Sequence, residues 1–273
     1  MRFILGATIL LLGLALAQAD PRVEALWSRY SAHLAAVLSE DLVAEMQNAD
    51  VIQLVMSVNS VESEGEIVST HTLDYVERSV LSTTESGGDY PFTTRTLYRG
   101  GKVTFFFTAG DITERSDPPA NQAAELAATL EQTFDQIDEM RDPEKLRALS
   151  EKGGTGTYEG YRVYGDILAG EQVALNPADN LFAAAIPGEV ATDISVVFTP
   201  NGYLAGQLMR VDGEQLLIVY KPPTAFPNGP APTTMRTYTV KGDTFVWQSD
   251  VTTQLIPNPV LSEGFYDPPA VTE

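Results

Sequence analysis

Residues 96–107 read Thr-Leu-Tyr-Arg-Gly-Gly-Lys-Val-Thr-Phe-Phe-Phe, two runs rich in β-branched and aromatic side chains around a Gly-Gly pair. Such side chains favour strands, and Gly100-Gly101 can adopt the positive φ angles of a tight hairpin. The stretch predicts two antiparallel strands, over residues 93–98 and 102–108. Val103, Phe105 and Phe107 share one face of the second strand and Phe106 lies on the other, so both faces of this sheet meet apolar material.

Similar runs of β-branched and aromatic residues, separated by turn sequences, lie on either side of this hairpin. Turn sequences Pro200-Asn201-Gly202, Asp212-Gly213 and Lys241-Gly242-Asp243 predict further hairpins, and a run holding five prolines predicts a stiff loop over residues 222–232. Consecutive antiparallel hairpins make a meander. The remaining strands are expected over residues 51–61, 66–84, 155–168, 172–175, 193–199, 203–211, 215–221, 233–241 and 244–256.

Helices are expected in two places. Val23, Leu26, Trp27, Tyr30 and Leu34 recur at helical spacing and predict an amphipathic helix from Pro21 to Met46. A helical insertion over residues 119–152 holds a helix over residues 121–140 and a shorter one that starts at Asp142-Pro143 and ends before Gly153-Gly154. The pattern predicts an α+β fold in which helices gather on one side or end of a curved antiparallel sheet.

The first nineteen residues predict a secretory signal peptide. Arg2 precedes an apolar stretch from Phe3 to Leu16, and Ala17-Gln18-Ala19 has small residues where a signal peptidase reads. The stretch is shorter than the roughly 20 apolar residues that a membrane span needs. We expect cleavage after Ala19, a periplasmic or secreted protein with no stable membrane span, and one domain over residues 20–273.

Charge and cysteine content exclude several kinds of partner and chemistry. The chain carries a formal charge of −20, or −21 without residues 1–19 and their one arginine. Nucleic acids and anionic headgroups need clustered Lys and Arg, so neither is an expected partner. The chain has no cysteine, which excludes disulfides, a thiolate nucleophile and Cys-ligated metal.

Motifs for catalysis and for cofactors are missing from the sequence. His33 and His71 have no second imidazole at ligand spacing, and no Gly-x-Ser-x-Gly motif occurs. No metal site and no cofactor are expected. Carboxylates along the predicted insertion favour a solvated helix face over a calcium loop, since they follow helical spacing: Glu131, Asp135, Asp138, Glu139, Asp142 and Glu144.

The arrangement resembles the LolA/LolB-like group of periplasmic lipoprotein carriers and related mycobacterial lipid-binding lipoproteins. The likeness lies in the order of elements: an amphipathic first helix, the hairpin at 96–107, a helical insertion, and closing hairpins such as 196–204 and 211–219. It implies an unclosed β-barrel with helices as a lid, no covalent chemistry, and lipid or lipidated protein as cargo. The resemblance assigns no functional role to an individual residue of this chain.

Alternation along the predicted elements supplies candidate lipid-binding residues. The proposed cavity lining is Phe105, Phe107, Phe198, Leu208, Leu216, Ile218, Phe245 and Trp247, and the proposed inner face of the lid is Leu126, Leu130, Phe134 and Ile137. Large apolar residues at these periods are also what a filled core uses.

Three functions therefore remain open from the sequence. The first is an exported carrier of lipid or lipoprotein. The second is a non-enzymatic envelope module that binds protein. The third is a hydrolase with paired carboxylates, since sequence shows no distances between them.

Overall fold

A computed structural model describes residues 20–38, 41–63, 65–142, 144, 156–175, 192–211, 213–225 and 231–272 of the chain. Three helices lie in these segments: α1 (Pro21–Leu38), α2 (Asp41–Gln47) and α3 (Ala120–Arg141). The strands are β1 (Val51–Ser60), β2 (Ile67–Asp74), β3 (Ser79–Ser86), β4 (Phe92–Arg99), β5 (Lys102–Ala109), β6 (Ile112–Ser116), β7 (Gly156–Tyr164), β8 (Leu168–Leu175), β9 (Thr192–Phe198), β10 (Leu204–Val211), β11 (Glu214–Thr224), β12 (Thr233–Lys241) and β13 (Thr244–Pro257).

All thirteen strands belong to one antiparallel sheet, in the order β6-β5-β4-β3-β2-β1-β13-β12-β11-β10-β9-β8-β7. Strands β1–β6 form one meander and β7–β13 a second one. The two meanders meet where β1 pairs with β13, from Ile52 opposite Pro257 to Ser60 opposite Ser249. Helix α3 lies between the two meanders in the chain, as the predicted helical insertion does.

The hairpin predicted over residues 93–108 is confirmed. Tyr98 pairs with Val103 and Arg99 with Lys102. Gly100 and Gly101 turn the chain with φ angles of 59° and 76°. Both values lie in the left-handed region that a two-residue hairpin loop of this type requires.

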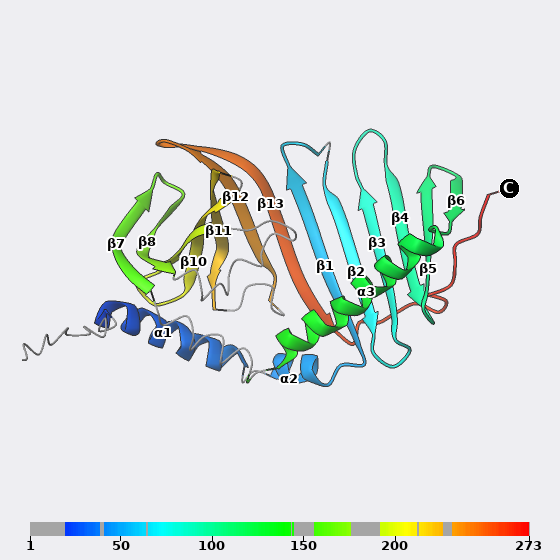
Figure 1. Ribbon diagram of the computed structural model, residues 1–273, viewed down its shortest axis with the longest axis horizontal. Helices are drawn as coiled ribbons and strands as arrows, with labels where there is room; N and C mark the ends of the chain where they lie inside the picture. Colours follow the sequence, from blue (N-terminus) through cyan, green and yellow to red (C-terminus); the bar gives the residue numbers. More distant parts are fainter. Residues whose placement is uncertain are drawn as a thin grey trace, which may run out of the picture.

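The sheet is bent and does not close into a barrel, and the helices lie along one face of it (Figure 1). Helix α1 runs along the second meander, and α3 crosses the first one. Within the second meander the sheet curls back on itself. The rings of Tyr164 on β7 and Phe245 on β13 show this curl, since their centroids are 6.2 Å apart although the two strands are not neighbours in the sheet. The α+β fold with an unclosed barrel is therefore confirmed.

The C-terminal segment, residues 258–272, runs back along the first meander to its outer edge. Its first residue, Asn258, donates its N–H to the carbonyl of Val51, and Thr272 donates its N–H to the carbonyl of Thr113 on β6. Between these ends, Arg95 donates a hydrogen bond of 2.9 Å to the carbonyl of Phe265. The C-terminal segment is thus hydrogen-bonded to the edge strand β6.

Two long strands of the sequence prediction are hairpins in the structure. The strand predicted over 66–84 is divided into β2 and β3 by a turn in which the carboxylate of Asp74 accepts the N–H groups of Val76 and Glu77. The strand predicted over 155–168 ends at Tyr164, and a turn at Gly165, with a φ of 57°, leads into β8. This turn contains neither glycine nor proline, and Asp74 is the residue that marks it in the sequence.

Other element boundaries also differ. The helix predicted over 21–46 is two helices, α1 and α2, and the polar stretch predicted over 111–119 contains β6. Strand β11 continues through Pro222 and Pro223 into the predicted loop, which is possible because its pairing with β12 ends at Lys221. The signal peptide, the short helix after Asp142 and the turn residue Asp212 lie outside the described residues, wholly or in large part.

Candidate functional site

Helix α3 packs on the first meander through one apolar stripe. Its buried residue Phe134 is fully inaccessible to solvent and meets the ring of Tyr75 edge-to-face, at 5.2 Å between centroids. Leu126, Ala127 and Leu130 are half-buried against the same cluster. The sheet side of the cluster is a row of opposed buried residues from β1 to β5: Ile52, Leu73, Val80, Tyr98 and Val103.

Polar contacts fasten α3 to the sheet beside this stripe. Arg78, in the β2–β3 turn, forms an ion pair with Glu131 of α3 and places its guanidinium carbon 4.5 Å from the ring centroid of Phe134. Tyr98 of β4 donates a 2.7 Å hydrogen bond to the other carboxylate oxygen of Glu131. This hydrogen bond, more than burial, raises the pKa of Tyr98. We call Arg78, Tyr98 and Glu131 the α3 latch.

The apolar surface of the first meander continues past the stripe that α3 covers. Phe105 and Phe107 follow Val103 on the same face of β5; Phe105 is half-buried and Phe107 is 44% exposed. Phe107 stacks on Phe92 of β4 at 5.8 Å. On β1 and β2, further half-buried apolar residues lie on this face: Met56, Val58 and Ile67.

Helix α1 seals the corresponding face of the second meander. Trp27 and Tyr30 meet the ring of Phe198 edge-to-face at 5.1 and 5.8 Å. Phe198 and Ile218 are buried in this cluster, and Leu216 packs against it. Burial raises the pKa of Tyr30. The predicted lining residues Phe198, Leu216 and Ile218 therefore form the surface on which α1 packs, which we call the seat of α1.

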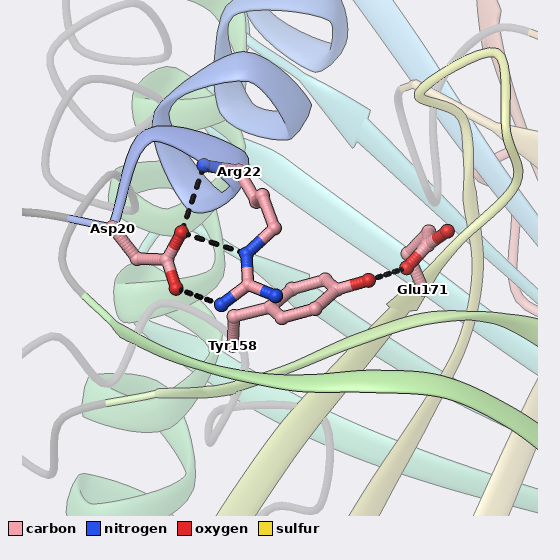
Figure 2. Close-up of polar contacts among 4 residues, drawn as sticks. All are labelled: Asp20, Arg22, Tyr158 and Glu171. Carbon is pink, nitrogen blue, oxygen red and sulfur yellow. Dashed lines mark hydrogen bonds and ion pairs between the residues drawn. The ribbon is translucent and has the colours of Figure 1, made fainter.

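The first turn of α1 is held to the β7–β8 hairpin by four side chains (Figure 2). Asp20 accepts the backbone N–H of Arg22 at 2.9 Å and also binds its guanidinium, which lowers the pKa of Asp20. Arg22 lies 4.0 Å above the ring centroid of Tyr158, and Tyr158 donates a hydrogen bond to Glu171. A carboxylate at this position also caps the helix N-terminus.

Three predicted lining residues lie on the opposite face of the second meander. Leu208 is buried there, and Phe245 and Trp247 pack against the same cluster inside the curl. Leu208 and Phe245 line a cleft of about 360 Å³, together with polar residues such as Gln172 and Arg162. Trp247 donates its ring N–H to Asp250, whose pKa is lowered chiefly by its hydrogen bond with Arg236.

The predicted site residues thus fall into three groups instead of one lining. Phe105 packs with the cluster of Leu126, Leu130 and Phe134 under α3, and Phe107 lies two residues farther along the same face of β5. The other two groups are the seat of α1 and the curl of the second meander. Ile137 belongs to α3, but its side chain lies outside the described part of the chain.

The α3 latch was missed in the sequence. Helical spacing favours a solvated position for Glu131, and Arg78 lies in a turn that the sequence pattern does not predict. The spacing of Glu131 and Phe134 is a signal for the latch. The two residues are three positions apart, so the carboxylate of Glu131 lies on the same helix face as an apolar residue.

Over the described segments, no helix is long and apolar enough to cross a membrane. The same segments hold no group of three or more His, Asp or Glu side chains placed to bind a metal ion. The two histidines are engaged with protein atoms: His33 bonds to the carbonyl of Asn201 at 2.8 Å, and His71 to the hydroxyl of Ser82 at 2.8 Å.

Comparison with protein-family models finds no match for this chain, and comparison with curated proteins finds none either. Among solved structures, the chain is similar to LprF from Mycobacterium bovis, with 16% identity over 89% of this chain and 96% of that one and a TM-score of 0.28. It is also similar to the Mycobacterium tuberculosis lipoprotein LppX, with 10% identity over 88% of this chain and 98% of that one and a TM-score of 0.26.

A DUF1329 family protein from Desulfovibrio piger is also similar, with 13% identity, coverage of 90% and 97%, and a TM-score of 0.22.

Proposed function

We propose that this protein is an exported, non-enzymatic carrier that shields the acyl chains of a lipid or lipidated protein between α3 and the first meander. The observation that carries the proposal is the apolar face of β1–β5. It is sealed by α3 along one row and continues beyond α3 as half-buried Phe105 and exposed Phe107. A contiguous apolar surface that is open to water marks a site of interaction, and a ligand-binding groove is one such site.

The energetics of this face suit acyl chains. Each CH₂ group removed from water contributes about 0.8 kcal/mol, so an aliphatic and aromatic surface is sufficient for affinity. Binding needs no charged group, in keeping with the acidic character of the chain.

The attachment of α3 suits a lid. Its polar fastening is the α3 latch, in which the side chains of Arg78 and Glu131 keep 54% and 36% of their surface exposed. Ion pairs this exposed contribute about 1 kcal/mol or less. Helix α3 can therefore part from the sheet at modest cost on its polar side, while Phe134 supplies the apolar contact that closes it again.

A charge placed on the exposed part of this face tests the proposal. N-phenyl-1-naphthylamine, an uncharged fluorophore that brightens in apolar sites, would be titrated into the mature protein and then displaced with dioctanoylglycerol. Phe107→Asp should weaken both affinities at least tenfold. Thr104→Asp puts the same charge on the opposite face of β5 and should leave them unchanged. If the wild-type protein does not bind the fluorophore, or if the two variants bind alike, the proposal is wrong.

A further inference from the structure

A patch of hydroxyl groups interrupts the apolar face beyond α3. Strands β2, β3 and β4 place two rows of opposed polar residues there, one next to the stripe of α3 and one farther out. The first row is His71, Ser82 and Thr96, and the second is Ser69, Thr84 and Thr94. We call these six residues the hydroxyl patch.

Apolar residues frame the hydroxyl patch on both sides. Leu54 and Met56 of β1 oppose His71 and Ser69 at one side. Phe105 and Phe107 of β5 oppose Thr96 and Thr94 at the other. A ligand that carries a polar group between apolar chains could place the polar group on the hydroxyl patch and the chains on the apolar residues to either side.

The hydroxyl patch carries no formal charge. His71 is its one titratable group, and burial lowers the pKa of this imidazole, which favours the neutral form. The facing residues of β1 and β5 on this face are also uncharged. A charged headgroup placed here would lose its hydration without gaining an opposite charge, which is costly.

Part of the patch is already hydrogen-bonded within the protein. Ser69 and Thr84 share a hydrogen bond of 3.1 Å, and Ser82 bonds to His71. Thr94 and Thr96 form no side-chain hydrogen bond with any described residue, and both are half-buried. A hydroxyl can donate one hydrogen bond and accept others, so these two threonines can serve a ligand carbonyl as donors.

From this we infer that the hydroxyl patch binds the uncharged carbonyl groups of a neutral acyl ester, with the acyl chains lying on the apolar residues to either side. The inference rests on the proposed function and narrows it to a ligand class. Threonine and serine hydroxyls donate to the ester carbonyls, and the lack of charge in the patch disfavours phosphate-bearing headgroups.

Matched ligands test the inference on the wild-type protein. After loading with N-phenyl-1-naphthylamine, the protein would be titrated with three competitors that have the same chain length: dioctanoylglycerol, its diether 1,2-di-O-octylglycerol, and dioctanoyl phosphatidylglycerol. The diether lacks carbonyl acceptors, and the phospholipid adds a charge. The ester should displace the fluorophore at a concentration at least tenfold lower than either of the others, since one hydrogen bond changes affinity about fivefold and the patch offers more than one.

Variants locate the preference in the patch. The double variant Thr94→Val/Thr96→Val keeps the shape of both side chains and removes both donors, so the ester and the diether should then compete within about threefold of each other. The control Thr93→Val alters the opposite face of β4 and should keep the wild-type preference.

The outcomes separate this inference from the proposed function. If the fluorophore binds but the ester and diether compete equally in the wild-type protein, or the phospholipid competes best, the hydroxyl patch is not a carbonyl site and the carrier proposal stands. If the preference survives in the double variant, the inference is also overturned. If the fluorophore does not bind at all, both proposals fall together.

Discussion

The guanidinium carbon of Arg78 lies 4.5 Å from the ring centroid of Phe134, and the same arginine forms an ion pair with Glu131 one turn earlier on α3. A single residue of the β2–β3 turn thus contacts both an apolar and a charged side chain on one face of the helix. Since Phe134 is fully buried and Glu131 is partly exposed, the two contacts have different strengths. The apolar contact fixes where α3 sits, and the polar contact affects how readily it leaves.

Truncating the apolar contact should destabilise the protein strongly. Phe134→Ala removes a fully buried ring and should lower the free energy of unfolding by about 3–5 kcal/mol, as measured by urea denaturation. Phe107→Ala removes a ring that is 44% exposed, and should cost about 1 kcal/mol or less. Equal losses from the two variants would show that α3 does not pack as described.

Weakening the latch should loosen α3 with little effect on the rest of the protein. Glu131→Gln removes the ion pair with Arg78 and should speed amide hydrogen exchange across α3, while global stability falls by roughly 0.2–1 kcal/mol. Glu125→Gln neutralises an exposed carboxylate on the same helix and should not change exchange. Unchanged exchange in Glu131→Gln would exclude the latch as a fastening.

A glycine at the β9–β10 turn sets how closely α1 approaches the sheet. Gly202 has a φ of 88°, and a Cβ atom there would lie 2.4 Å from Cβ of Arg29 on α1. Gly202→Ala should therefore be destabilising by backbone strain and by displacement of α1. Gly242→Ala, at a φ of 61° with open space around it, should show the backbone strain alone. We expect Gly202→Ala to cost at least about 1 kcal/mol more in urea denaturation; equal costs would contradict the close approach of α1.

Burial of His71 should make stability depend on pH. The folded protein holds the pKa of this imidazole below its ordinary value of 6.5, so near that pH the unfolded chain binds more protons. The stability from His71 is complete above pH 6.5 and is lost as the pH falls from 6.5 through the folded pKa. His71→Gln should remove this component between about pH 7 and pH 5 in urea denaturation. If both proteins lose stability equally over this range, the imidazole is not buried as described.

Much of the fold follows from local sequence. The hairpin at Gly100-Gly101 is recognisable because only certain residues accept its φ angles. The apolar residues on both faces of β5 and β11 correctly predicted that both faces of these strands are covered. The turn after Asp74 was missed because a carboxylate, and not a glycine, stabilises it.

The grouping of the site could not be predicted from alternation alone. Leu204 and Leu208 of β10 are four residues apart, so strict alternation would place them on one face, yet they belong to clusters on opposite faces of the sheet. Which face a residue takes across several strands depends on irregular register, such as the shifts at Leu204/Gly206 and at Thr237/Tyr238. Alternation alone does not fix these shifts, and it therefore groups Phe198 with Trp247 in one predicted lining although the two residues lie on different faces.

The carrier proposal is tested most directly by native mass spectrometry of the chain without its predicted signal peptide, purified from an envelope fraction, followed by extraction of any bound lipid. We predict a bound species of lipid mass that is absent from Phe134→Asp. The control Ala128→Asp, which adds the same charge to an exposed position of α3, should retain the bound species. A wild-type protein that shows a clean apo mass under gentle conditions would contradict the carrier and favour a protein-binding module of the same fold.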